Sequence, residues 1–265
     1  MNGIGLAVAR SRMDDRFVLS LVHALADPLV EEGLSLTTAV VDDAAAEEAV
    51  YRHWAEVGGI GGVALLGVEQ DDPRVPLLAS LGFPVAGVVD SAVETDIPAV
   101  VVDFDASIDV LRAFLDTRPP RRIVFISATL EGEPADGRAA AMESAELGGT
   151  FGVVRTEHST AAAVAAGAAA LADGPVTLVF DSDVPAAAAL ESYTAQGLRV
   201  PEDVAIVSWT DSALCRSASR SLTAIDRRGS EIGALLGTRV LAAVAGDRTT
   251  RVRAPRPFVV AGETA

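Results

Sequence analysis

The chain alternates short runs of β-branched, apolar residues with longer stretches of helical periodicity. In the first half, the apolar runs that predict strands are Ile4–Val8, Leu36–Val41, Gly62–Leu66, Val85–Val89 and Val100–Val102. The stretches between them, such as Asp15–Glu32 and Ala44–Val57, predict helices. Continuous apolar strands that alternate with helices indicate a parallel sheet covered by helices on both faces.

The same rhythm restarts after the break at Arg118-Pro119-Pro120-Arg121. The strands predicted in this second block are Ile123–Ser127, Gly152–Val154, Val176–Phe180 and Val204–Val207. The helices predicted between them are Gly137–Leu147, Ala161–Ala172 and Val184–Gln196. A strand at Leu222–Ile225, a helix from Arg228 to Val244 and a strand at Phe258–Val260 complete the chain. Two successive blocks of similar length predict an α/β protein with two lobes.

Composition restricts the classes of partner. The 265 residues are 50% apolar, which is ample for a buried core, and the net charge is -16. The 21 cationic side chains are all arginine, so neither a Schiff-base lysine nor a phosphate-loop lysine is available. A protein that binds duplex DNA usually carries a basic stripe, and no such stripe is visible in the sequence.

The single cysteine, Cys215, excludes an internal disulfide and favours a reducing cytoplasm. The apolar run Gly3–Ala9 is too short for a secretory signal, and no basic stretch precedes it. The alanine-rich run Thr160–Ala172 is only weakly apolar, so we expect no membrane span and no membrane partner.

The sequence offers little support for catalysis. The glycine-rich stretch Gly58–Gly62 precedes a strand, whereas a phosphate loop must open a helix. No serine lies in a G-x-S-x-G elbow, and His23, His53 and His158 have no metal-ligand spacing. We therefore expect no catalytic residues, no metal and no cofactor.

A binding cleft has better support, because ligands of open α/β sheets bind beyond the carboxyl ends of the strands. Polar residues follow several predicted strands, namely Arg10-Ser11-Arg12, Asp90-Ser91, Asp103, Asp181-Ser182-Asp183 and Thr210-Asp211. Carboxylates and guanidinium groups suit a polyol. Helix capping by Ser182 or Asp183 is the alternative explanation for that segment, and lining a cleft is compatible with it.

The segment Val200–Ala224 reads V-P-E-D-V-A-I-V-S-W-T-D-S-A-L-C-R-S-A-S-R-S-L-T-A. It resembles the V-P-x-D, apolar strand, G-aromatic-D-D and P-P-L-T-T segments of the effector-binding core of LacI/GalR-type transcription regulators. The resemblance extends over nearly the whole chain. It implies a two-lobed periplasmic-binding-protein-like fold in which each lobe is a parallel sheet flanked by helices, with three interlobe crossovers. The lobes implied are 1–102 plus about 227–256, and 103–226 plus about 257–265.

The resemblance also implies ligand-binding residues. Asp90 stands where these regulators often place a ligand-facing Asp, and Arg138 lies in a segment similar to the family's R-x-x-G-aromatic helix start. His158 falls near a site where some members stack a Trp on a sugar, and a solvated loop histidine is the favoured alternative. The expected ligand-binding set is Arg10, Arg12, Arg16, Phe17, Asp90, Asp103, Arg138, His158, Ser182, Asp183, Trp209, Thr210 and Asp211.

Two departures from the family pattern bear on the ligand. Ser182 replaces the usual Asn of an (A/S)-N-D triplet, and Thr210 replaces the first Asp of G-aromatic-D-D. Both changes weaken hydroxyl acceptors. A cluster of Arg10, Arg12, Arg16 and Arg138 near one cleft would suit a phosphorylated or carboxylated ligand instead of a neutral sugar. Aromatic stacking platforms are few, and the candidates are Phe17, Phe104 and Trp209.

The function implied is that of a small-molecule sensor, a sugar or sugar phosphate being the effector, which works by lobe closure in a homodimer. No helix-turn-helix signature precedes Gly3, so DNA is expected to be bound only through a head absent from this chain. Three explanations are open for the missing head: it was removed, the coding frame starts late, or the protein is a free-standing sensor. Removal is favoured. A solute-binding protein of a transporter, or an α/β enzyme, are the other classes considered. The apolar run of Phe17–Leu29 suits a dimer interface or packing on its own sheet equally well.

Overall fold

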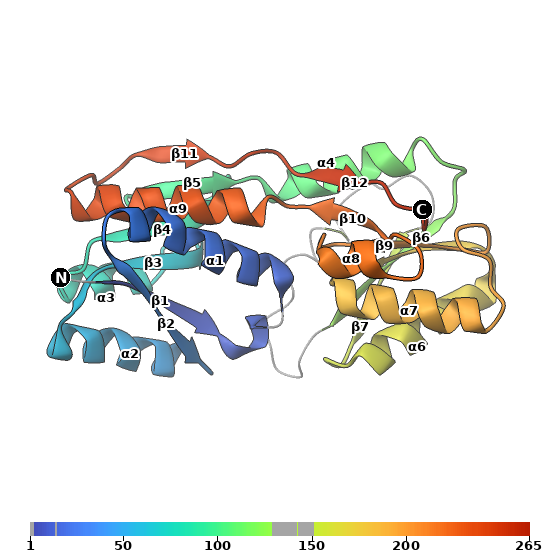
Figure 1. Ribbon diagram of the computed structural model, residues 1–265, viewed down its shortest axis with the longest axis horizontal. Coiled ribbons are helices and arrows are strands. Elements are labelled where there is room, and N and C mark those ends of the chain that lie inside the picture. The colour runs from blue at the N-terminus through green and yellow to red at the C-terminus, as the bar shows by residue number, and fades with distance from the viewer. Residues whose placement is uncertain (1–2, 14, 129–141, 143–150) are drawn as a thin grey trace. The chain divides into compact units, whose positions relative to one another are not determined.

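The computed structural model describes residues 3–13, 15–128, 142 and 151–265 (Figure 1). The chain divides into two compact units. Unit 1 comprises Met1–Phe104 and Arg228–Arg256, and unit 2 comprises Asp105–Arg227 and Pro257–Ala265. The chain therefore passes three times from one unit to the other, after Phe104, after Arg227 and after Arg256.

Unit 1 is built on a parallel sheet whose strand order is β11-β5-β4-β3-β1-β2. Its strands are β1 (Gly3–Ala9), β2 (Ser35–Val41), β3 (Ile60–Val68), β4 (Val85–Asp90), β5 (Ala99–Val102) and β11 (Arg251–Arg253). Its helices are η1 (Arg10–Arg12), α1 (Arg16–Glu31), α2 (Ala44–Val57), α3 (Arg74–Ser80) and α9 (Gly229–Val244).

Unit 2 repeats this arrangement with the order β12-β10-β9-β8-β6-β7. Its strands are β6 (Arg122–Ala128), β7 (Phe151–Thr156), β8 (Val176–Phe180), β9 (Val204–Ser208), β10 (Thr223–Asp226) and β12 (Phe258–Val260). Its helices are α4 (Phe104–Leu115), α6 (Thr160–Ala170), η2 (Leu171–Asp173), α7 (Asp183–Ala195) and α8 (Ala213–Ser217). Among the strands described in this unit, only β12 runs antiparallel to its neighbour. The predicted two-sheet α/β fold is confirmed. The predicted helix at Gly137–Leu147 falls, apart from residue 142, outside the described residues.

Both faces of the unit 1 sheet are covered, which explains why its central strands read as continuous apolar runs. One core forms between the sheet and helices α1 and α9, and includes Leu6, Leu25 and Leu236. The other forms beneath α2 and α3, and includes Trp54 and Leu78. The edge strand β2 is mostly exposed and shows polar positions accordingly.

Side-chain caps explain where two helices of unit 1 begin. Asp15 Oδ1 accepts a hydrogen bond from Phe17 N at 2.9 Å and starts α1. Asp43 Oδ1 accepts one from Ala46 N at 2.8 Å and starts α2. Each cap satisfies a backbone N–H that has no partner within its own helix. Helix α2 accordingly covers the predicted range without change.

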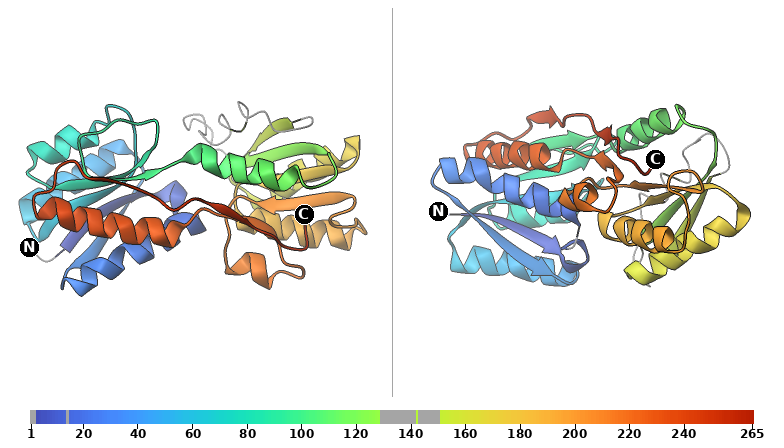
Figure 2. Two further views of the ribbon diagram at one scale, coloured as in Figure 1. Left: turned by 90° about the horizontal axis from the view of Figure 1, so that it is seen from above. Right: turned by 45° about the vertical axis from the view of Figure 1, so that its right-hand side comes forward.

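Helices α1 and α9 lie side by side on one face of the unit 1 sheet (Figures 1 and 2). Three glycines of α9 face α1, at a spacing of four residues: Gly229, Gly233 and Gly237. A Cβ atom placed on Gly233 would lie 2.1 Å from the carbonyl oxygen of Leu21. The two backbones therefore approach so closely that no side chain fits between them.

The apolar run of α1 is used within its own unit. Val18, Leu21, Leu25 and Leu29 are buried and belong to the core that α1 forms with α9 and the sheet. This packing accounts for the run without a second chain, so the run lends no support of its own to a dimer.

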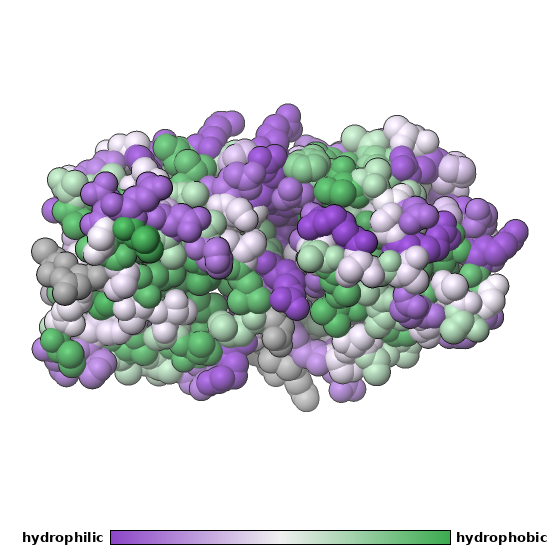
Figure 3. Space-filling view, in the orientation of Figure 1, coloured by the Kyte–Doolittle hydropathy of each residue, from purple (hydrophilic) through white to green (hydrophobic). Residues whose placement is uncertain are grey.

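The exposed large apolar side chains of the described residues are few, and most are valines. They are Val30, Val40, Val57, Val154, Val184 and Phe258, which lie on six different elements. Hydrophobic and hydrophilic residues are intermixed over the face seen in Figure 3. None of the helices in the described part of the chain has the length and apolar character needed to span a membrane.

Candidate ligand-binding site

Each sheet has a point where successive strands diverge. In unit 1, β2 lies on one side of β1 and β3 on the other; in unit 2, β7 and β8 lie on the two sides of β6. The loops that follow the two central strands at such a point lead away from each other and leave a crevice at the carboxyl edge. Ligands of open α/β sheets bind at this position. The carboxyl ends of the β1/β3 pair and of the β6/β8 pair are therefore the candidate binding positions.

A cavity of about 510 Å³ lies at the β1/β3 position, and all of its lining residues belong to unit 1. Its size suits a small organic ligand. The apolar lining residues are Ala7, Val8, Ala9, Ala44, Leu66, Pro73 and Leu77. The remaining lining residues are Arg12, Glu47, Glu48, Tyr51, Gly67, Glu69, Asp72 and Arg74. Apolar surface together with hydroxyl and carboxylate acceptors suits the two faces of a sugar ring.

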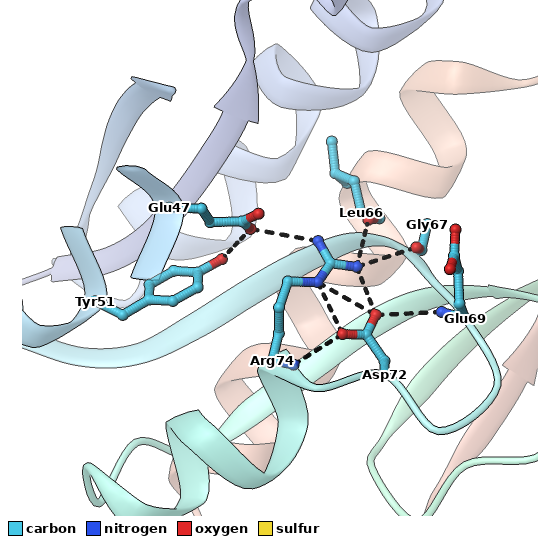
Figure 4. Close-up of polar contacts among 7 residues, drawn as sticks. All are labelled: Glu47, Tyr51, Leu66, Gly67, Glu69, Asp72 and Arg74. Atoms are coloured by element: carbon cyan, nitrogen blue, oxygen red, sulfur yellow. Dashed lines mark hydrogen bonds and ion pairs between the residues drawn. The ribbon is translucent and has the colours of Figure 1, made fainter. Parts of the chain in front are cut away.

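Arg74 holds one wall of the cavity together (Figure 4). Its Nη2 lies 2.6 Å from Asp72 Oδ2 and 3.0 Å from the carbonyl oxygen of Gly67, while Nη1 lies 3.3 Å from Glu47 Oε1. The Arg74 side chain is 23% exposed and that of Asp72 only 4%. One guanidinium thus joins α2 to the loop between β3 and α3, in the planar multidentate geometry that only arginine provides.

Tyr51 completes this network from α2. Its hydroxyl donates to Glu47 Oε1 at 2.5 Å. Burial and the neighbouring Glu47 carboxylate raise the pKa of Tyr51 far above its ordinary value, so the phenol keeps its proton and remains a donor. Glu47 Oε1 therefore accepts hydrogen bonds from both the Tyr51 hydroxyl and Arg74 Nη1, which fix the carboxylate in one orientation toward the cavity.

The Asp72 carboxylate makes the stability of unit 1 dependent on pH. Burial alone would raise the pKa of Asp72, but hydrogen bonds and charge from Arg74 outweigh it, so the pKa is lowered. A lowered folded-state pKa contributes stability above the unfolded value of about 3.9, and this contribution is lost as the pH falls through the folded value.

We expect Asp72→Asn to make the free energy of unfolding, measured in urea between pH 7 and pH 3, fall less steeply as the pH is lowered. Asp27→Asn, which makes the same change at an exposed carboxylate of α1, is the matched control.

The predicted arginine cluster is only partly brought to the cavity. Arg12 lines it, whereas Arg10 is exposed and pairs with Asp42 at 2.5 Å. Arg16 is the exposed first residue of α1, and Arg138 lies outside the described residues. Phe17 is half-buried and packs on the core beneath α1.

The two remaining predicted residues of unit 1 lie near its first crossover. Asp90, at the end of β4, accepts hydrogen bonds from Ala92 N at 2.9 Å and from Phe104 N at 3.2 Å. Asp103 is exposed and immediately precedes α4. The Asp90 carboxylate therefore fixes the backbone at Ala92 and Phe104.

In unit 2, Asp181 occupies the β6/β8 position. It is buried, and its Oδ2 accepts a hydrogen bond from Ala128 N at 2.6 Å. Asp183 is buried as well, and its Oδ2 accepts from the Ser212 hydroxyl at 2.5 Å, which joins the starts of α7 and α8. Ser182 stands at the N-cap position of α7 but makes no capping hydrogen bond with its side chain. Asp181 and Asp183 of the predicted triplet are thus both buried and hydrogen-bonded within unit 2.

The segment after β9 holds three predicted residues. Trp209 is fully buried with its ring edge-on to Phe125, so in this structure it packs in the core instead of offering a stacking face. Thr210 is also buried, and Asp211 binds Arg216 at 2.6 and 2.8 Å. His158, in contrast, is exposed in the loop before α6.

Sequence reasoning missed several residues of these edges. The network of Glu47, Tyr51, Asp72 and Arg74 was not anticipated, and neither was Arg227, whose Nη2 donates to Thr210 Oγ1 at 2.9 Å. Arg227 follows a predicted strand, and that position is the one signal that could have identified it. Across the described residues, no group of three or more His, Cys, Asp or Glu side chains is placed to hold a metal ion.

Comparison with known proteins shows the family to which the chain belongs. Residues 113–265 match the model of the periplasmic binding protein-like domain, which is more than half of the chain. The chain belongs to this family. Within it, the chain is similar in sequence and fold to LacI family transcription regulators, in agreement with the resemblance seen in the sequence.

Individual relatives agree with this assignment. The regulator CelR of Thermobifida fusca is 28% identical over 207 residues, which cover 73% of this chain and 60% of CelR. A LacI family transcriptional regulator from Bifidobacterium animalis subsp. lactis is 25% identical, with a TM-score of 0.85 over 99% of this chain and 97% of that one. The structure of a CelR–cellobiose complex has the same fold, with a TM-score of 0.77 at 22% identity over 100% of this chain and 85% of that one. The chain thus spans about 60% of the length of the curated relative that it matches.

Proposed function

We propose that this chain is the small-molecule-sensing core of a LacI-family transcription regulator. The observation that carries the proposal is the cavity at the β1/β3 divergence point, in a fold shared with regulators of that family over 99% of the chain. Bound effector stabilises one arrangement of the two lobes over another through its differential affinity, and no covalent chemistry is needed. The chain works in the cytoplasm as a homodimer and acts on DNA through a DNA-binding head.

We further propose a neutral, sugar-like effector. One relative with this fold is described as a complex with cellobiose. The cavity lining carries four carboxylates, Glu47, Glu48, Glu69 and Asp72, against the two guanidinium groups of Arg12 and Arg74. Because Arg74 is already bound to Asp72 and Glu47, only Arg12 remains to meet a phosphate. This balance favours hydroxyl donors over the phosphorylated ligand that the arginine-rich sequence also suggested.

The ligand-binding residues proposed on the described edges are Arg12 at the cavity and Asp90, Asp103, Asp183, Thr210 and Asp211 at the carboxyl ends of the strands. A solute-binding protein of a transporter shares the fold and is the second candidate. It would bind the same class of ligand, but it would show no effect of that ligand on association with DNA once a head is present.

Thermal unfolding with a ligand panel tests the proposal. The panel contains glucose, cellobiose, maltose, their phosphates, polyols and nucleosides, and it is applied to the parent and to Arg12→Ala. A ligand at about 100 times its Kd should add roughly 2.7 kcal/mol to the free energy of unfolding, which raises Tm by several degrees. We expect one neutral sugar class to give this shift and Arg12→Ala to reduce it.

Arg248→Ala removes an exposed arginine of unit 1 that does not line the cavity, and it should respond like the parent. An equal rise of Tm with ligand in Arg12→Ala and in Arg248→Ala would show that Arg12 does not contribute to ligand binding. A panel without any shift would argue against a sensing function.

A further inference from the structure

Asp90 and Thr210, at the carboxyl edges of the two sheets, accept hydrogen bonds from residues at which the chain leaves a unit. Asp90 Oδ2 accepts from the backbone N of Phe104, which is the last residue of unit 1 before the first crossover. Thr210 Oγ1 accepts from Nη2 of Arg227, which is the last residue of unit 2 before the second crossover. Each contact lies within a single unit, and each ends at a unit boundary.

The neighbouring contacts fix both residues in place. Asp90 Oδ1 is held by Ala92 N at 2.9 Å, so the carboxylate cannot turn away from Phe104 without losing a second bond. The backbone of Thr210 is tied to the Ser208 hydroxyl, which donates to its carbonyl oxygen at 2.7 Å. The next residue, Asp211, donates its N–H to the carbonyl oxygen of Ile225 in β10 at 3.0 Å. Both side chains are thus rigidly mounted on a strand end.

Both acceptor atoms have hydrogen-bonding capacity left, although Thr210 is buried. A carboxylate oxygen has two lone pairs, and a threonine hydroxyl that accepts one hydrogen bond still has its own proton to donate. The Asp90–Phe104 bond is long at 3.2 Å, at the weak end of the N–H···O range. A ligand hydroxyl that binds Asp90 Oδ2 shares this oxygen with the Phe104 N–H and weakens their bond, and a ligand acceptor that binds the Thr210 hydroxyl reorients it against Arg227.

We propose that Asp90 and Thr210 are positioning residues that tether the crossovers at Phe104 and Arg227, so that ligand contact at either side chain is passed directly to the segments joining the two units. The coupling to a ligand rests on the proposed sensing function, but the tethering itself does not. Together the two bonds restrict the backbone at two of the three crossovers, and their loss widens the range of arrangements that the units adopt.

The test measures the distance between the units without any ligand. Spin labels are attached at Glu56→Cys on α2 and Ala168→Cys on α6, two exposed positions, one in each unit, while the native Cys215 is buried and stays unlabelled. The variants are Asp90→Asn, which leaves one acceptor oxygen, and Thr210→Val, which keeps the shape and removes the hydroxyl. We expect each to change the population ratio of unit arrangements by roughly tenfold, the size of one hydrogen bond involving a charged group, and thereby to broaden the distance distribution.

Three controls separate tethering from general destabilisation. Thr210→Ser retains the hydroxyl and should restore the parent distribution. Asp43→Asn makes the same carboxylate-to-amide change at the N-cap of α2, and Thr238→Val removes a hydroxyl that donates within α9; neither lies at a crossover. Parent-like distributions in both Asp90→Asn and Thr210→Val, or equal broadening in Asp43→Asn, would overturn the inference. These outcomes are independent of whether the ligand panel finds an effector, which tests the sensing function alone.

Discussion

Gly233→Val is expected to lower the free energy of unfolding by about 3 kcal/mol, because a side chain here must force two helices apart. The nearest atoms to a Cβ at this position are backbone atoms of Leu21, which lie within 3.0 Å and cannot rotate away as a side chain would. Valine has a better helix propensity than glycine, which acts in the opposite direction by only a few tenths of a kcal/mol. Steric overlap therefore decides the sign.

Urea unfolding followed by circular dichroism measures this effect, and Tm should fall by about 6–12 °C. Thr238→Val places the same side chain on the exposed side of the same helix. It should change the free energy of unfolding by less than about 0.5 kcal/mol. A comparable loss in both variants would mean that the α1–α9 contact is not what Gly233 maintains.

The strands and long helices could be predicted because burial leaves a strong pattern in the sequence. Val176–Phe180 is buried at every position and was predicted with its observed bounds, and so was α2. The amphipathic helix α4 was also missed, but the other elements that sequence reasoning missed lack such a pattern. Helix α3 has seven residues and contains Pro76, and strand β11 has three residues and two exposed arginines. Their structure depends on neighbours that are distant in the sequence.

The candidate site could be predicted only as an edge of each sheet. Positions after strands identified Arg12 and Asp90, because the topology places strand ends together. The partner of a side chain could not be predicted in the same way. Arg74 and Glu47 are 27 residues apart, and no local pattern marks either of them. Trp209 lies in a polar S-W-T-D segment that reads as a loop, yet its ring packs against Phe125 of another strand.

Arg74→Met is expected to cost about 3 kcal/mol of stability, the lower end of the range for a broken buried ion pair because the guanidinium is partly exposed. The loss has two sources. Asp72 is left as a buried carboxylate without its counter-ion, and the loop between β3 and α3 loses its attachment to the Glu47 carboxylate on α2. Arg52→Met breaks an exposed pair with Glu48 on the same helix and should cost less than about 0.5 kcal/mol.

A double-mutant cycle with Asp72→Asn isolates the pair from the rest of the network. Once Asp72 is neutral, Arg74→Met no longer leaves a buried charge without its partner. The free energy of unfolding of the double variant should therefore exceed the value expected from adding the two single effects by at least about 1 kcal/mol. Strict additivity would show that Arg74 stabilises the protein through its other contacts and not through Asp72. In the ligand panel, Arg74→Met should weaken the effector at least about tenfold even in the double variant. Neutralising Asp72 restores the charge balance but does not rebuild the wall of the cavity that Arg74 holds to Glu47 and to the carbonyl oxygen of Gly67.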